Sequence, residues 1–470
     1  MSEAPRVRKT GCPHSSDAHE IDAAKARPMA EMVGRALERA ADFVRNLGAL
    51  AVGHAVGRLC SLVVLAVVGR ELGPEALGDL ALGQTLSQYV RMGSEFGTTQ
   101  IGARLVARRK ASAQDVLGVV LRKRALLTAV AVVVGVVYAC LGPVPAGTHH
   151  TLLIFAVAGG VFGFSLEWLM WGFERYGAIA SSQAGVAVIY LLGAVCAVVL
   201  ATRYPLIWIA IAYCVAVVFG AALLWGIWRS SAKELEQTDA EARQETAVEA
   251  GWGPVAILGS AVLMNQLFQT VDVFLLGALS TAAELGRYSA GRRILFTIFG
   301  VYYMVTQAAF PIIARAGRTP QRNRALATAV AAVVAAGGIV AVVMVLYARE
   351  MLALIYGPRL DGAAEALRVL AMTCPLEFAT AMLGTVLVAD GRNGLLLGAL
   401  GAGTVADAIG VLLWVPRHGA AGAAWAKLIS YVILLAAMQL LAVEPGRVWL
   451  AAKRRGRTKV SIERHDEGRA

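Results

Sequence analysis

Long apolar segments recur along this chain of 470 residues, from about residue 47 to about residue 443. Each segment is roughly 18 to 28 residues long, enough for a helix rising about 1.5 Å per residue to cross about 30 Å of hydrocarbon. The core of a soluble protein does not contain so many long apolar segments, and only 16% of the residues here are charged. The sequence therefore predicts an all-α polytopic membrane protein. We count twelve segments, over 47–69, 78–104, 124–142, 151–172, 177–201, 206–228, 253–278, 284–313, 325–347, 364–389, 394–415 and 419–443.

The second and eighth segments carry more polar residues than the others. Arg91 and Glu95 lie in one of them, and Arg292 and Arg293 lie in the other. Apolar positions nevertheless continue at helical spacing between the polar ones, as expected for a helix with one face on water or on polar partners. We therefore retain both as membrane-spanning helices.

Lys and Arg residues predict the orientation of the chain. The formal net charge is +12, and the short loops after even-numbered segments hold thirteen of these residues against five on the opposite side. By the positive-inside rule the richer side is cytosolic, and an even number of spans brings both termini there. The richer side comprises Arg104, Arg108, Arg109, Lys110, Arg122, Lys123, Arg124, Arg175, Arg315, Arg318, Arg322, Arg324 and Arg392. The opposite side comprises Arg70, Arg203, Arg349, Arg359 and Arg417.

A polar interruption divides the membrane region into two halves. We predict a cytosolic N-terminal tail (1–46), an N-lobe of six helices (47–228), a cytosolic linker (229–252), a C-lobe of six helices (253–443) and a basic cytosolic tail (444–470). The halves echo each other, since Leu77-Gly78 aligns with Leu285-Gly286. An even number of spans per half makes this a parallel repeat. Two pseudo-symmetric lobes predict a central cavity between them.

Several motifs resemble one known family. Glu-Leu-Gly-Pro-Glu-Ala-Leu-Gly-Asp-Leu (71–80) leads into a polar second helix, which the basic segment Arg-Leu-Val-Ala-Arg-Arg-Lys (104–110) follows. Leu-Ala-Leu-Ile-Tyr-Gly-Pro (352–358) and Val-Pro-Arg-His-Gly-Ala-Ala-Gly-Ala-Ala-Trp-Ala (415–426) occur in the second half. Together they resemble the polysaccharide exporter and O-antigen flippase family of the multidrug/oligosaccharidyl-lipid/polysaccharide exporter superfamily.

This resemblance implies two six-helix lobes that alternate access to a central cavity. It implies a substrate as well, a polyprenyl-diphosphate-linked oligosaccharide carried from the cytosolic to the outer leaflet of the bacterial cytoplasmic membrane. Such a protein would act with the lipid bilayer and with polysaccharide polymerases and glycosyltransferases. No enzyme activity and no cofactor are implied.

Charged residues within the predicted spans are the candidates for a binding site, because each costs about 2.5–3.5 kcal/mol at the bilayer centre and needs a partner or a task. A lipid diphosphate needs cations, and Arg holds phosphate oxygens in a bidentate manner. We predict that the substrate-binding cations are Arg58, Arg91, Arg292, Arg293 and Lys427.

Structural ion pairs are the competing interpretation of the same residues. Arg91 and Glu95 are spaced i,i+4 on one helix face and can neutralise each other, and Arg58 can pair with Asp272. Arg292 and Arg293 point about 100° apart on a helix, so at most one of them aims straight into the cavity.

Membrane-embedded carboxylates are candidates for coupling transport to a proton or sodium gradient, because an acid in low dielectric can carry a proton. Asp272, Glu377 and Asp407 are the three candidates. Pro375 lies two residues before Glu377 and predicts a bend in that helix.

Other functions fit the sequence less well. Cys12, His14 and His19 lie in a polar tail without a second cysteine pair, so we infer no metal site. Basic residues gathered around apolar spans do not indicate a nucleic-acid binder. The longest external stretch, about 348–363, is short for the active site of a membrane polymerase or ligase. A cation-coupled multidrug exporter remains the alternative function, although the acids are dispersed along the sequence, and a twelve-helix facilitator fold remains possible by span count.

Overall fold

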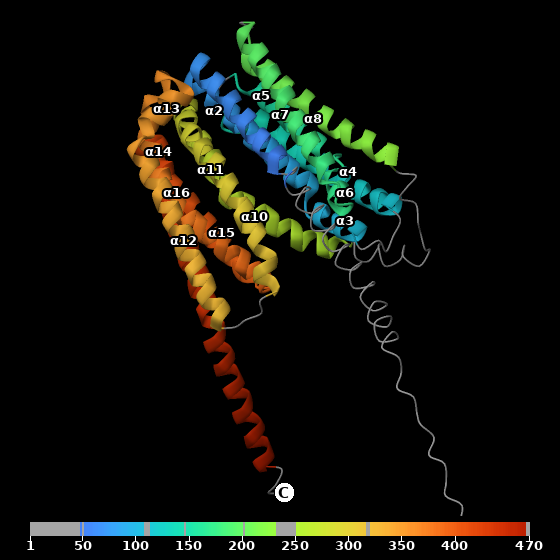
Figure 1. Ribbon diagram of the computed structural model, residues 1–470, viewed down its shortest axis with the longest axis vertical. Coiled ribbons are helices and arrows are strands. Elements are labelled where there is room, and N and C mark those ends of the chain that lie inside the picture. The colour runs from blue at the N-terminus through green and yellow to red at the C-terminus, as the bar shows by residue number, and fades with distance from the viewer. Residues whose placement is uncertain are drawn as a thin grey trace, which may run out of the picture.

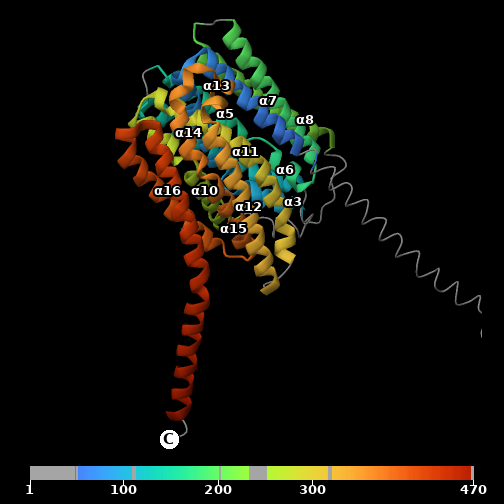
Figure 2. The same ribbon diagram turned by 60° about the vertical axis from the view of Figure 1, so that its left-hand side comes forward.

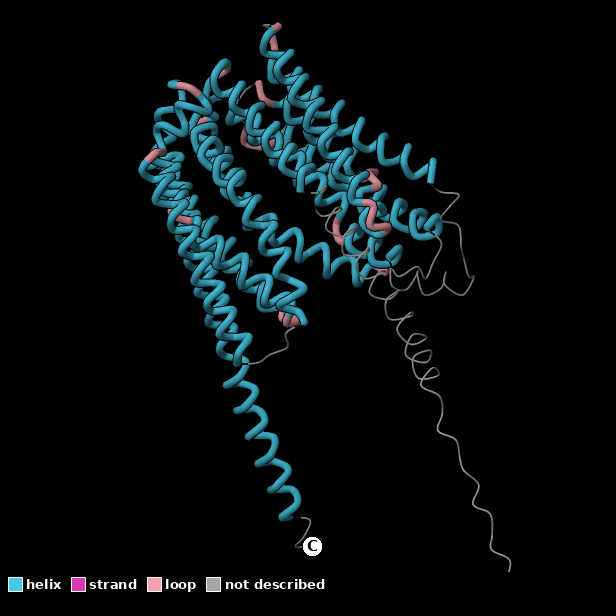
Figure 3. Tube along the Cα trace, viewed as in Figure 1, coloured by secondary structure: helices cyan, strands magenta, loops and turns pink. Residues whose placement is uncertain are grey.

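The computed structural model describes residues 48, 51–107, 113–144, 147–200, 203–231, 251–315 and 320–466. Every regular element in these ranges is a helix, and most helices run along one common direction (Figures 1 and 3). The predicted all-α class is confirmed. Cys12, His14 and His19 lie outside the described residues, as do most of the predicted linker and the N-terminal tail.

The first half of the chain forms one bundle. Its first helix, Ala51–Glu71, is followed by helices that pack mainly on one another, with α2 against α4 and α5, and α7 against α8. These helices are α2 (Gly73–Glu95), α3 (Thr98–Ala107), α4 (Ala113–Leu141), α5 (His149–Phe162), α6 (Glu167–Gly172), α7 (Tyr176–Val199) and α8 (Pro205–Ser231).

The second half forms another bundle beside the first, coloured yellow to red in Figures 1 and 2. Its helices are α10 (Trp252–Leu279), α11 (Ala282–Arg315), α12 (Pro320–Leu346), α13 (Ala348–Tyr356), the 3₁₀ helix η2 (Pro358–Ala363), α14 (Ala364–Ala371), α15 (Cys374–Ala389) and α16 (Asn393–Asp466). Beyond the bundle α16 continues as a helix to Asp466, so most of the segment predicted as a C-terminal tail extends the last helix.

Within the described residues, eight helices are long and apolar enough to cross a membrane, or nine if the bent pair α14 and α15 forms one span. The predicted second and eighth spans, which contain α2 and α11, are not among them because of their polar residues. The first ten predicted segments each coincide with a helix or a pair of helices, whereas the last two lie in the single element α16, on either side of its break at Gly419. The number twelve itself stays a prediction.

Breaks within predicted spans have local causes. Gly97 has φ +73° and separates α2 from α3, and Gly419 has φ +51° and interrupts α16. These left-handed conformations favour glycine, which has no Cβ. The amide of Ala420, freed by the second break, donates to Glu284 Oε2 at 2.8 Å. The bend predicted near Pro375 is confirmed, since α14 and α15 meet at an angle of 42°.

One predicted loop is wrong. The sequence predicts Arg122, Lys123 and Arg124 in a cytosolic loop before the third span, but α4 already begins at Ala113 and contains all three. Arg124 is only 1% exposed, because its guanidinium reaches into the N-terminal bundle. A charge count along the sequence does not separate such a residue from a topology signal.

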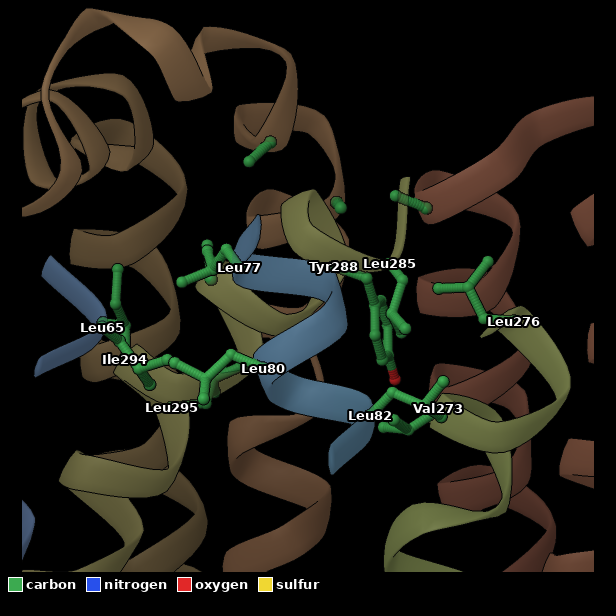
Figure 4. Close-up of a cluster of buried hydrophobic side chains, with 14 of the residues drawn as sticks. Leu65, Leu77, Leu80, Leu82, Val273, Leu276, Leu285, Tyr288, Ile294 and Leu295 are labelled. Atoms are coloured by element: carbon green, nitrogen blue, oxygen red, sulfur yellow. The ribbon is translucent and has the colours of Figure 1, made fainter. Parts of the chain in front are cut away.

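The two bundles meet along α2, which lies between α10 and α11. Figure 4 shows Leu80 of α2 beside Ile294 and Leu295 of α11, and Leu82 of α2 beside Val273 of α10, and Leu77 belongs to the same cluster. These side chains are at most 4% exposed. Apolar side chains of both halves therefore share one continuous core.

Glycines allow the bundles to touch at both ends of α2. A Cβ on Gly78 would lie 1.9 Å from the carbonyl oxygen of Ala282, and one on Gly286 would lie 1.8 Å from that of Pro74. Near the other end of α2, a Cβ on Gly97 would lie 2.2 Å from the carbonyl oxygen of Val255. Backbone therefore meets backbone at both ends, and the Leu-Gly repeat noted in the sequence marks the predicted external contact.

Candidate substrate cavity and buried charge clusters

A cavity of about 830 Å³ lies mainly within the N-terminal bundle and reaches α11 of the other half. Its wall is polar for a membrane protein. Glutamine, tyrosine and serine side chains from the first helix, α2, α7 and α8 contribute to it, together with charged groups. Three of the five predicted substrate-binding cations line this cavity, namely Arg58, Arg91 and Arg293.

Arg91 is held by carboxylates of its own bundle. Its Nε lies 3.2 Å from Glu95 Oε1, as the i,i+4 spacing predicts, and its Nη2 lies 3.2 Å from Glu167 Oε2. Gln183 donates to the other oxygen of Glu167 at 2.6 Å, and the guanidinium lies 4.3 Å from the centre of the Phe162 ring. The sequence does not single out Glu167, because it lies 76 residues from its partner.

Arg124 is a second buried cation close to this group. It donates to the hydroxyls of Thr98 at 3.0 Å and Thr99 at 2.6 Å, and to the carbonyl oxygens of Gly163 and Ser165 at 3.2 Å. These acceptors lie beside the α2–α3 and α5–α6 breaks, where backbone carbonyls are released from helical hydrogen bonds. Arg91 and Arg124 together balance Glu95 and Glu167 in charge.

Arg293 and Arg58 lie where the first helix faces α11. Arg293 donates from Nη2 to the hydroxyl of Ser61, and Arg58 donates from Nη1 to the carbonyl oxygen of Phe296 at 3.0 Å. In the described part of the chain, no carboxylate forms an ion pair with Arg293. A further cavity of about 290 Å³ is lined by both arginines. Positive charge is therefore in excess at Arg293.

The expected pair between Arg58 and Asp272 is not formed. Asp272 of α10 instead binds two cations of the C-terminal bundle. Arg292 Nη1 lies 2.6 Å from its Oδ1, and Lys427 Nζ lies 3.1 Å from its Oδ2. The hydroxyl of Tyr288 also donates to Oδ2. Asp272 is completely buried and has no free oxygen for Arg58.

Lys427 and Asp407 lie on the two parts of α16. With Asp272 and Arg292 they form a group of buried charges that we call the C-lobe cluster. Lys427 Nζ donates to Asp407 Oδ2 at 2.6 Å and to the carbonyl oxygen of Phe268 at 2.8 Å. Its ion pair with Asp272 Oδ2 at 3.1 Å adds a third oxygen, so the ammonium is surrounded by acceptors of its own bundle. Lys427 does not line the 830 Å³ cavity, so its geometry does not support the predicted contact with substrate.

Glu377 of α15 lies at the edge of the same cluster. It lines a small space together with Arg292, Lys427 and Tyr431. The structure therefore gathers all three predicted coupling acids in one place, although they are separated by as much as 135 residues in the sequence. The expectation that the acids are dispersed is wrong in three dimensions.

Adjacent arginines on α11 have different surroundings. Arg292 points to Asp272 and lies 5.0 Å from the Phe296 ring centre, whereas Arg293 points to the first helix. Both line a cavity of about 280 Å³ between α2, α10 and α11. As their predicted angular separation indicates, Arg292 belongs to the C-lobe cluster and Arg293 lines the large cavity.

We expect Asp272→Ala to destabilise the protein by about 3–5 kcal/mol, because the change leaves Arg292 and Lys427 buried without their shared carboxylate. Thermal unfolding of the purified protein in detergent measures the effect. Glu365→Ala, which removes an exposed carboxylate of the same bundle, is the matched control. Equal stability of both variants would show that Asp272 does not hold the cluster together.

Solved membrane transporters share this fold. A lipid II flippase, MurJ, in an inward closed conformation is 12% identical with a TM-score of 0.67, over 84% of this chain and 87% of that chain. An inward-facing multidrug resistance MATE family transporter of the MOP superfamily is 13% identical with a TM-score of 0.60, over 86% and 96%. A MATE transporter of Vibrio cholerae is 16% identical with a TM-score of 0.60, over 87% and 98%. The chain is thus a multi-pass membrane protein with the fold of the MOP superfamily of transporters.

The sequence itself places the chain more narrowly. Residues 43–316, more than half of the chain, match the family described as "Polysaccharide biosynthesis protein". The protein belongs to this family, as the resemblance of its motifs implies. No curated protein sequence matches the chain.

Proposed function

We propose that this protein flips a polyprenyl-diphosphate-linked oligosaccharide from the cytosolic to the outer leaflet of the bacterial cytoplasmic membrane by alternating access. Membership of a polysaccharide biosynthesis family and the fold shared with a lipid II flippase support this proposal. The observation that carries it is the unbalanced positive charge of Arg293 in the wall of the large cavity.

The distribution of charge supports an anionic substrate at this position. In the N-terminal bundle, Arg91 and Arg124 are matched by Glu95 and Glu167, and in the C-lobe cluster two cations face three acids. Arg293 stands outside both groups and has a serine hydroxyl as its partner. A diphosphate placed against Arg293 would supply the negative charge that Arg293 lacks, and arginine suits phosphate oxygens in particular.

The rest of the cavity suits a sugar. Its volume of about 830 Å³ falls in the range of about 300–1,000 Å³ typical of ligand pockets. Gln84, Gln88, Tyr190 and Tyr213 offer amide and hydroxyl groups to sugar hydroxyls. The polyprenyl chain would remain in the bilayer, which solvates it as well as any protein surface could. Both termini would be cytosolic, and polymerases and glycosyltransferases would act on either side of the step.

Among the three coupling candidates we favour Glu377 as the group that takes up a proton. Asp272 and Asp407 form ion pairs with cations, whereas Glu377 forms no ion pair in the described part of the chain and lines a small space with Tyr431. Tyr288, Arg292 and Lys427 are the other charged or titratable groups that line this space.

We expect Glu377→Gln to abolish the stimulation of flipping by an imposed pH gradient, since an amide cannot exchange a proton. Rates in proteoliposomes with and without the gradient measure the effect, and Asp390→Asn, at the end of the same helix, is the control. A variant that still responds fully to the gradient would exclude Glu377 as the coupling group.

A cation-coupled multidrug exporter remains the second candidate, and the gathering of Asp272, Glu377 and Asp407 in one bundle favours it. Two measurements separate the functions. Depletion of the protein should cause lipid-linked oligosaccharide to accumulate on the cytosolic leaflet, and purified protein in liposomes should move a fluorescent lipid-diphosphate oligosaccharide between leaflets. Drug sensitivity without such accumulation would support the exporter and overturn the flippase.

A further inference from the structure

The C-lobe cluster holds an ammonium where a dissolved cation could otherwise bind. Lys427 Nζ is surrounded by three oxygens, Asp407 Oδ2 at 2.6 Å, the Phe268 carbonyl oxygen at 2.8 Å and Asp272 Oδ2 at 3.1 Å. These ligands come from two carboxylates and one backbone carbonyl, the oxygen types that bind hard cations in proteins. The lysine residue is only 4% exposed and both aspartates are fully buried.

From this geometry we infer that Lys427 acts as a permanently tethered cation, so that the C-lobe requires no dissolved monovalent cation to neutralise Asp272 and Asp407. The inference concerns the cation and not the substrate. It therefore stands or falls separately from the proposed flippase function.

The physical basis of the tethered cation is the need to balance the charge of the two buried aspartates. A buried carboxylate that loses its partner is strongly destabilising, and two carboxylates converge on this one ammonium. Arg292 compensates only one of them, because it contacts Asp272 and not Asp407. Asp407 also has one oxygen, Oδ1, that is buried without a hydrogen-bond partner in the described part of the chain. Removal of the Lys427 side chain would leave a cavity lined by the oxygens of Asp407, Asp272 and Phe268, with negative charge that no cation compensates.

This arrangement makes a specific prediction about monovalent cations. The wild-type protein should have the same apparent melting temperature in NaCl as in choline chloride, whose cation is too large for the site. Lys427→Ala should melt at a lower temperature in choline chloride, and NaCl should raise that temperature in a saturable manner, because a ligand that binds only the folded state stabilises it by mass action.

Two control variants separate cation binding from simple damage. Lys427→Ala combined with Asp407→Asn removes one positive and one negative charge, and its melting temperature should not depend on NaCl. Lys427→Arg keeps the tethered charge and should likewise be insensitive. Melting is followed by size-exclusion chromatography of heated samples, which needs no transport assay and works for variants that are inactive.

Three outcomes would overturn the inference. The first is stabilisation of the wild-type protein by NaCl relative to choline chloride. The second is a Lys427→Ala variant that melts at the same temperature in both salts. The third is a double variant that responds to NaCl as strongly as the single one. A protein that passes these tests and yet moves no lipid-linked oligosaccharide would refute the flippase proposal alone.

Discussion

Arg293→Ala is expected to reduce flipping of a lipid-diphosphate oligosaccharide by roughly tenfold to a hundredfold, because a hydrogen bond to a charged group contributes about 1.5–3 kcal/mol. The guanidinium lines the large cavity and pairs with no described carboxylate, so its charge is available to a phosphate. Its removal breaks no ion pair seen in the structure, and stability should change little. Initial flipping rates in proteoliposomes measure the loss.

One further variant tests whether the positive charge of Arg293 suffices or whether its planar guanidinium is needed, and another serves as a control. Arg293→Lys keeps the charge without the planar fork and should fall between wild type and Arg293→Ala. Arg203→Ala removes an exposed arginine, and it should flip at the wild-type rate. Undiminished flipping by Arg293→Ala would remove this residue from the proposed binding site and leave the charge excess without a role.

Gly286→Ala should nearly abolish transport by preventing the two bundles from meeting at the predicted external end. The added Cβ would lie 1.8 Å from the carbonyl oxygen of Pro74, far inside the 3.4–4 Å of an ordinary contact. That oxygen belongs to backbone and cannot turn away as a side chain would. Helices α2 and α11 must therefore separate, and the cavity should become accessible from outside.

Accessibility can be measured directly. In a cysteine-free background, Gln84→Cys places a thiol in the wall of the large cavity, and a membrane-impermeant maleimide should label it from outside faster when Gly286→Ala is present. Gly118→Ala is the matched control, because a Cβ there meets no atom within 4 Å. Equal labelling in both backgrounds would contradict a closed external contact between α2 and α11.

Sequence reasoning succeeded where a property depends on segment length and periodicity. The all-helical membrane class follows from apolar runs, since the bilayer demands helices of a minimum length. The Arg91–Glu95 pair and the bend near Pro375 also came out as expected, because both are set by neighbours within one helix turn.

Partners separated by many residues could not be found in this way. Analogy between the halves pairs Asp272 with Arg58, but Asp272 lies on Arg292 and Lys427. Glu167 gave no signal because it lies in a short helix after a break, and Arg124 gave none because its neighbours in the sequence resemble a basic loop. Ion pairs depend on how the helices are rotated against one another, which one sequence does not reveal.

Apolar segment length, the distribution of Lys and Arg and a few glycine and proline positions determined the class of this protein and its predicted orientation, because the membrane acts on each helix separately. Only the tertiary structure decided which buried charges neutralise each other. It joined Lys427, Asp272 and Asp407 in one cluster and left Arg293 in the cavity wall. The reason is that electrostatic compensation requires contact within a few ångströms, and packing of the two bundles alone brings these residues that close.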